Sequence, residues 1–308
     1  MTISAAPSAL AVRTLVTLGD STPAGFGDPL PDGRWRGFPA LLGAALGAQV
    51  VNTARAGARM GCVRREQLPV ALRALGAGEP SVAVVFAGMN DTLRSDFDPA
   101  ALRADCAAVV AALRAVGAHV LLVRYHDHTR VFRLPGPLRR ALRRRIAALN
   151  ESVDRVVGSV VGSAVDPPVG VVDPVRPAPG IGVLDLDTVP GCYDRAAWSV
   201  DRLHPSELGH RLLAAGLAGL VVEAGYDMAR PVSLACGGGR PVTRTDRAAW
   251  LVARGVPWLL RRGRDLGPVI VQGMLDGVRR PSGWPAPGPS LGGGVGAGGD
   301  PVAAPRRA

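Results

Sequence analysis

Residues 14–21 of the chain read TLVTLGDS. The first five are apolar or β-branched without interruption, which is typical of a strand that is buried on both faces of a sheet. The strand stops at Gly19, and Asp20 and Ser21 follow it at once. A similar apolar run, SVAVVF, occupies residues 81–86 and leads into AGMND. Both runs predict central strands of a parallel sheet with polar residues at their carboxyl ends.

Strands and helices alternate along residues 13–225. We expect strands at 14–18, 50–51, 81–86, 119–124 and 181–186, and helices at 38–46, 99–116, 138–157 and 206–224. Asp98 suits the N-cap of the second helix, and Gly117 suits its end. The alternation predicts an α/β fold, a three-layer α/β/α domain around a doubly wound sheet of about five parallel strands. Ligands bind such a sheet at the carboxyl ends of its strands.

The remaining sequence falls into shorter segments. Residues 1–12 form an N-terminal segment, and residues 226–281 are expected to be a basic amphipathic helical extension. Residues 282–308 are rich in Pro, Gly and Ala, which predicts a disordered tail. Residues 158–180, rich in Gly, Pro and Val, are interpreted as an insertion on the face of the domain away from the predicted site.

The composition excludes several classes of protein. The 308 residues carry 36 basic and 25 acidic side chains, a net charge of +11, and every basic residue is arginine. Without lysine the chain cannot supply a Walker A loop, a pyridoxal Schiff base or the usual kinase lysine. Its four cysteines form no CxxC pair, which disfavours a zinc ribbon. A signal-peptide pattern and an apolar run of about 18 residues are also missing, so we expect a cytoplasmic protein.

Ser21 lies where the first strand gives way to a Gly-rich turn. There its side chain would be exposed at the sheet edge, with its N–H near a helix start, which suits a nucleophile that also stabilises an oxyanion. The alternative is an ordinary helix N-cap. A serine nucleophile needs a base and a group to orient it. Asp201 and His204 can supply both, because the three-residue offset lets the carboxylate reach Nδ1; alternatively, His204 merely precedes a helix.

Two more residues follow predicted strands and suit an oxyanion hole. The Asn90 side chain can donate to an oxyanion from the end of the strand at 81–86. Gly57 lacks a Cβ, so its N–H can approach a ligand closely. Each has a plain alternative as a turn residue. What favours the catalytic interpretation is that all these pieces are expected at one edge of one sheet.

This combination resembles the SGNH hydrolase (GDSL-type esterase/lipase) family. The resemblance rests on GDS at 19–21, Gly57, GMND at 88–91 and DRLHP at 201–205. AWS at 197–199 and ELGH at 207–210 resemble its intracellular actinobacterial branch, whose C-terminal extension would reach about Arg280. The sequence departs from the family pattern at Thr22, where leucine is usual, and in the loose block around Gly57. No GxSxG elbow is present, which disfavours the α/β-hydrolase fold.

The resemblance implies Ser21 as nucleophile, His204 as base and Asp201 as the partner of that base. It implies an oxyanion hole formed by the N–H groups of Ser21 and Gly57 and the amide of Asn90. The implied activity is cleavage of a small-molecule or lipid ester through an acyl-serine intermediate, with no metal or other cofactor. Acyl transfer to another alcohol, and a non-catalytic basic protein that binds membranes or nucleic acid, are the alternative functions.

The motif YHDH at 125–128 emerges at the same predicted edge. We interpret Tyr125, His126 and His128, together with Asp20, as parts of the substrate pocket wall. The two histidines could instead bind a metal, but the spacing offers no third ligand. An exposed loop is the plain alternative.

Two arginine clusters remain. The first, interpreted as the solvated face of a helix, comprises Arg139, Arg140, Arg143, Arg144 and Arg145. The second lies within residues 243–280 beside Trp250 and Trp258, where it indicates either a peripheral membrane contact or a helical flap on the domain. We favour the flap. Nucleic acid is not an expected partner, because no recognition motif accompanies the charge, and the sequence leaves the oligomeric state open.

Overall fold

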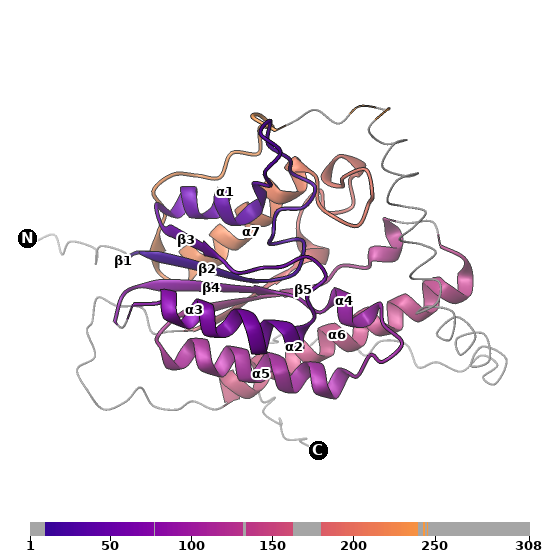
Figure 1. Ribbon diagram of the computed structural model, residues 1–308, viewed down its shortest axis with the longest axis horizontal. Coiled ribbons are helices and arrows are strands. Elements are labelled where there is room, and N and C mark those ends of the chain that lie inside the picture. The colour runs from indigo at the N-terminus through magenta and orange to yellow at the C-terminus, as the bar shows by residue number, and fades with distance from the viewer. Residues whose placement is uncertain are drawn as a thin grey trace, which may run out of the picture.

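The computed structural model describes residues 10–239 apart from 77, 132–133 and 163–179, together with residues 243 and 245. A sheet of five parallel strands lies at its centre, in the order β3-β2-β4-β5-β6 (Figure 1). Its strands are β2 (Thr14–Gly19), β3 (Gln49–Asn52), β4 (Ser81–Phe86), β5 (His119–Arg124) and β6 (Ile181–Asp185). The predicted three-layer α/β fold is confirmed.

Helices cover both faces of the sheet (Figure 1). On one face lie α1 (Gly37–Leu46) and α7 (Glu207–Glu223), which pack against each other. The opposite face carries α2 (Met60–Cys62), the π-helical turn η1 (Val63–Gln67), α3 (Leu68–Ala74), α5 (Pro99–Ala115) and α6 (Gly136–Gly162). The short elements are α4 (Met89–Thr92), η2 (His128–Arg130), η3 (Leu186–Thr188) and η4 (Arg195–Ala197).

The two central strands, β2 and β4, are buried at every position. Their register pairs Leu15 with Val82 and Gly19 with Phe86, so the two strands end together. Burial on both faces explains why they are apolar throughout. The shared end places Asp20, Ser21 and the residues that follow β4 at one edge of the sheet.

The predicted helices agree closely with the observed ones where a cap marks their ends. The Asp98 carboxylate accepts hydrogen bonds from the N–H groups of Ala100 and Ala101, as expected of an N-cap. Ser206 caps α7 in the same way through Gly209. α6 extends beyond the predicted 138–157 at both ends.

The prediction missed two features. The first is the helical stretch from Met60 to Ala74, in which the π-helical turn shifts the apolar spacing and polar Gln67 takes a buried position. The second is a small parallel sheet of β1 (Leu10–Ala11) and β7 (Tyr226–Asp227). Two-residue strands are too short to show a period in sequence.

Several sequence predictions lie outside the described residues. These are most of the segment 1–12, residues 163–179 of the predicted insertion, the greater part of the extension 226–281, and the tail 282–308. Residues 226–239 of the extension are described and contain β7 but no helix, so the prediction of helix is wrong there. Within the part that is described, no helix combines the length and apolar content needed to cross a membrane.

Gln67 fastens the end of β2. Its Nε2 donates to the Gly19 carbonyl at 2.8 Å, and its Oε1 accepts from the Gly19 N–H at 2.7 Å. Gly19 itself has φ of 147°, and a Cβ there would lie 2.0 Å from the Phe86 carbonyl oxygen. The residue before Asp20 and Ser21 is therefore held by both its backbone groups, in a conformation suited to glycine.

Replacing Gln67 by Ala should lower the free energy of unfolding by about 1–3 kcal/mol, because the buried Gly19 N–H loses its partner. Urea unfolding monitored by circular dichroism measures the change. Gln49→Ala, at an exposed position of β3, is the matched control and should stay within about 0.5 kcal/mol of wild type. Equal effects of the two substitutions would show that Gln67 does not fasten the strand.

Candidate active site

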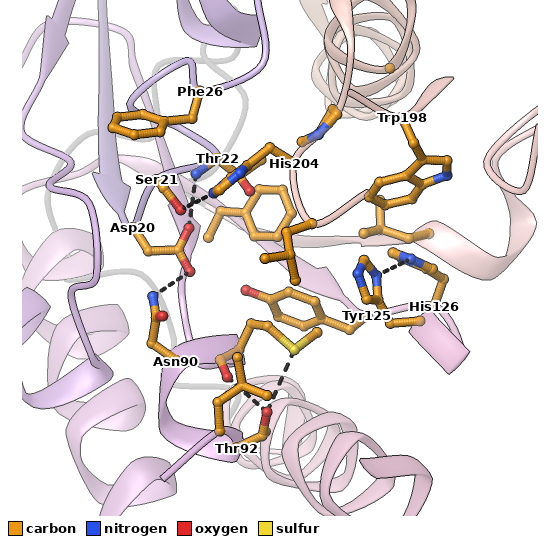
Figure 2. A pocket seen from close by; sticks show the side chains of 18 of the residues that line it. Asp20, Ser21, Thr22, Phe26, Asn90, Thr92, Tyr125, His126, Trp198 and His204 are labelled. Carbon is orange, nitrogen blue, oxygen red and sulfur yellow. Dashed lines mark hydrogen bonds between the residues drawn. The ribbon is translucent and has the colours of Figure 1, made fainter. Parts of the chain in front are cut away.

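Ser21, His204 and Asp201 form a chain of hydrogen bonds. His204 Nε2 lies 2.7 Å from Ser21 Oγ, and His204 Nδ1 lies 2.6 Å from Asp201 Oδ2. Ser21 follows β2, whereas the other two residues belong to the loop that enters α7 (Figure 2). The structure thus brings together three residues that the sequence singled out separately.

Asp201 is held as an anion. Burial by itself would raise the pKa of this carboxyl, but hydrogen bonds from His204 and Ser199 outweigh it and bring the pKa to about 2. Ser199 Oγ donates to Asp201 Oδ1 at 2.6 Å, and the same oxygen accepts from the N–H groups of Leu203 and His204. An ionised acceptor fixes the His204 proton on Nδ1, which leaves Nε2 free to take a proton from Ser21.

Turns follow Ser21, rather than the helix start that the sequence suggested. The first helix begins only at Gly37. Pro23 and the positive φ angles of Gly25 (91°) and Gly27 (97°) explain the difference, because neither geometry continues a helix. At Gly27 a Cβ would lie 1.9 Å from the Pro205 carbonyl oxygen. This glycine therefore lets the turn pack directly against the loop that carries His204.

His210, on α7, binds the same turn through its side chain. Its Nδ1 accepts from the Phe38 N–H at 3.1 Å, and its Nε2 bonds the Phe26 carbonyl at 2.9 Å. Burial lowers the pKa of His210 to about 4. The ring is therefore neutral, with its proton on Nε2, and both nitrogens are satisfied.

Ser21, Gly57 and Asn90, the three predicted oxyanion donors, line one pocket. Among the described residues, the backbone N–H groups of Ser21 and Gly57 make no hydrogen bond. Asn90 Nδ2 donates to the Ala58 carbonyl at 3.1 Å and, over a longer 3.4 Å, to Asp20 Oδ2 (Figure 2). Gly57 has φ of 78°, and a Cβ would meet nothing within 4 Å. Its backbone angle, rather than crowding, is thus what favours glycine here.

Asp20 differs from Asp201 in its environment. It is only 4% exposed, and burial raises its pKa to about 6 against the opposing effect of the Thr22 N–H. The nearby charge of Asp91 adds to the rise, while His204 lowers it. The Thr22 N–H donates to Asp20 Oδ1 at 3.0 Å. Asp20 therefore supports the turn behind Ser21 and the amide of Asn90.

Comparison with known proteins shows the family of this chain. Residues 17–212 match the family described as GDSL-like Lipase/Acylhydrolase. The chain belongs to this family. It is therefore a hydrolase of the GDSL esterase group, although the matches single out no branch within the family.

Solved structures of several lipolytic enzymes match about two thirds of this chain. A lipolytic protein of the G-D-S-L family from Veillonella parvula has a TM-score of 0.50 at 15% identity, over 68% of this chain and 99% of that one. A psychrotrophic esterase from Pseudoalteromonas sp. gives 0.47 at 18% identity, over 68% and 97%. A lipase/acylhydrolase from Enterococcus faecalis gives 0.44 at 22%, over 68% and 95%. A search of curated proteins found no match.

A cavity of about 610 Å³ opens beside Ser21 in this GDSL hydrolase. Its lining is mostly apolar, and α6 and the residues between β6 and α7 form part of it. The α6 contribution includes Leu138, Ala141, Leu142 and Arg145, while Arg139, Arg140, Arg143 and Arg144 are exposed. The predicted solvated face is thus confirmed for these four arginines but is wrong for Arg145, which lines the cavity and donates to the Thr92 carbonyl. The spacing of Leu138, Leu142 and Arg145 signals the cavity face, which was not predicted.

Tyr125, His126 and His128 also line this cavity. All three are at most 5% exposed, so the alternative of an exposed loop is wrong. Figure 2 shows the Tyr125 ring between the Asp20 side and the His126 side of the cavity. Within the described residues, no three His, Cys, Asp or Glu side chains gather as metal ligands, and the cysteines, all described, are free.

Asp20→Asn should change how the stability of the hydrolase depends on pH. The folded-state pKa of Asp20, about 6, exceeds the ordinary 3.8, so its ionisation opposes folding. The free energy of unfolding of wild type should therefore fall as pH rises from about 4 to 6, whereas Asp20→Asn, which stays neutral at this position, should not show this fall. The difference in unfolding free energy, variant minus wild type, should therefore grow by up to about 3 kcal/mol.

Urea unfolding at about pH 4 and pH 7.5 measures this difference. Asp32→Asn is the control, since hydrogen bonds from the Arg34 backbone N–H and side chain lower the pKa of that exposed carboxyl. The unfolding free energy of Asp32→Asn minus that of wild type should not grow as pH rises. An Asp20→Asn difference that is the same at both pH values would contradict the assignment.

Proposed function

We propose that the protein hydrolyses an ester with an apolar acyl chain, by way of an acyl-enzyme on Ser21. The observation that carries the proposal is the Ser21–His204–Asp201 hydrogen-bond chain at the side of an apolar cavity. Such a chain activates a serine, because the base takes the hydroxyl proton as the oxygen attacks. The cavity volume falls within the range of pockets that bury a drug-sized ligand.

The reaction runs in two halves. Ser21 Oγ bonds to the ester carbonyl carbon while its proton passes to His204 Nε2, and Asp201 stabilises the imidazolium that forms. The tetrahedral oxyanion lies among the N–H groups of Ser21 and Gly57 and the Asn90 amide. It collapses as the alcohol leaves with the proton from His204. Water, deprotonated by His204, then attacks the acyl-enzyme carbonyl carbon. The bond to Ser21 Oγ breaks as that oxygen takes the proton back from His204, and the acid is released.

The oxyanion donors account for much of the expected acceleration. One such donor contributes about 2.7–4 kcal/mol to a transition state. The N–H groups of Ser21 and Gly57 make no hydrogen bond among the described residues, which leaves both available to an oxyanion. The third, Asn90, needs only to exchange its long bond to Asp20 for one to the substrate. These features support acyl chemistry in preference to simple binding of a membrane or nucleic acid.

The acyl acceptor is proposed to be water. The same intermediate would give a new ester in place of an acid if an alcohol entered instead. Product analysis in the presence of added alcohols separates the two activities, since only transfer raises ester yield at the expense of free acid. No step in either scheme requires a cofactor.

A panel of p-nitrophenyl esters of increasing chain length tests the proposal. For wild type, kcat/KM should rise by about fourfold per added methylene until the cavity is filled, because each buried methylene contributes about 0.8 kcal/mol. Ser21→Ala should abolish turnover of every ester. Leu142→Trp, which fills the α6 side of the cavity, should move the optimum to shorter chains.

Leu142→Met is the matched control, because it conserves volume, and its chain-length optimum should remain that of wild type. Turnover that survives in Ser21→Ala would contradict the acyl-enzyme. A Leu142→Trp optimum unchanged from wild type would contradict the placement of the acyl chain in this cavity.

A further inference from the structure

The buried histidine pair has no part in the acyl-transfer steps, although it lines the same cavity. His128 Nδ1 and His126 Nε2 lie 2.8 Å apart. Both rings pack on Trp198, with ring centroids 5.0 and 4.9 Å from the indole. The two histidines thus form a buried hydrogen bond, next to the loop that carries Asp201 and His204.

The direction of this hydrogen bond follows from the other partner of His128. Burial lowers the pKa of His128 to about 3, and a hydrogen bond with the Arg202 backbone opposes this effect, as a bond to a carbonyl acceptor does. Since Nδ1 faces His126, the carbonyl must be bonded by Nε2. The neutral ring therefore carries its single proton on Nε2, and Nδ1 is an acceptor.

His126 must then be the donor of the pair. Burial lowers its pKa to about 4, so this ring is also neutral. Its proton lies on Nε2 and points to His128 Nδ1. A directed chain results, in which His126 donates to His128, and His128 donates to the Arg202 carbonyl.

Arg202 is the point in the catalytic loop that most needs support. Its φ is 53°, and among the described residues it is the only non-glycine residue with a positive φ. Side chains disfavour this region, and such a conformation persists only where its surroundings hold it. Across this turn Asp201 Oδ1 accepts from the N–H groups of Leu203 and His204. The turn at Arg202 therefore sets how Asp201 meets His204.

We propose that His126 and His128 are positioning residues, which hold the Arg202 carbonyl and thereby the turn that aligns Asp201 with His204. The inference rests on the proposed function, because it assigns the pair a role in the same site. Both rings act as neutral groups with fixed proton positions. Trp198 packs against them and keeps the pair in place.

The test compares kcat and KM of three variants with those of wild type, for one ester substrate taken up to saturating concentration. His128→Leu removes the donor to Arg202 and should lower kcat by about 10- to 100-fold, as expected of a misaligned catalytic group, with KM little changed. His128→Gln can both donate to Arg202 and accept from His126, and should recover most of the lost kcat. The matched control is His119→Leu, a buried histidine at the other end of β5, which should keep the wild-type kcat per folded molecule.

A second readout does not depend on turnover. The proton between His204 Nδ1 and Asp201 should give a strongly downfield NMR resonance, because that bond is short. It should be present in wild type, His128→Gln and His119→Leu, and lost or shifted in His128→Leu. Circular dichroism establishes the folded fraction of each variant.

Two results would overturn the inference. One is a folded His128→Leu protein with the wild-type kcat and resonance. The other is a His128→Gln protein no better than His128→Leu in either readout. Failure of the proposed function can be told apart from failure of this inference. If wild type had no esterase activity, the resonance in wild type and His128→Leu would still show whether His128 aligns Asp201 with His204.

Discussion

The site depends on one 2.7 Å hydrogen bond between Ser21 Oγ and His204 Nε2, whose residues lie 183 positions apart in the chain. Such a bond can persist only if the end of β2 and the loop before α7 are fixed against each other. Direct backbone packing of Gly27 on Pro205 provides part of that fixation. His210 provides the rest, because it bonds the turn after Ser21 from a helix that follows His204.

A second constraint is electrostatic. Asp20 and Asp201 both lie close to His204, yet their pKa values are driven apart, to about 6 and about 2. Burial acts to raise the pKa of both carboxyls. At Asp201 it is outweighed by hydrogen bonds from His204, Ser199 and two backbone N–H groups, whereas Asp20 has one good donor and one long one. Different environments for neighbouring acids allow a site to keep one carboxylate ionised while the pKa of the other is raised.

Sequence patterns predicted what depends on local chemistry. The apolar strands, the N-cap at Asp98 and the polar residues after each strand follow from burial and from backbone hydrogen bonding, and the parallel sheet then brings the site residues to one edge. Contacts between distant elements could not be predicted in this way. Gln67 is polar but buried, because it satisfies Gly19 across the sheet edge. Likewise, which face of α6 lines the cavity depends on how that helix packs, and the role of His128 depends on a partner 74 positions away.

Labelling with a fluorophosphonate probe tests the central claim most directly, because the probe reacts with a serine only when a base activates it. Wild type and His204→Ala would be treated side by side, and the adduct mapped by peptide mass spectrometry. We expect an adduct on Ser21 in wild type that is lost in His204→Ala, with both proteins folded. An unlabelled Ser21 in folded wild type, or equal labelling of the two proteins, would contradict the claim.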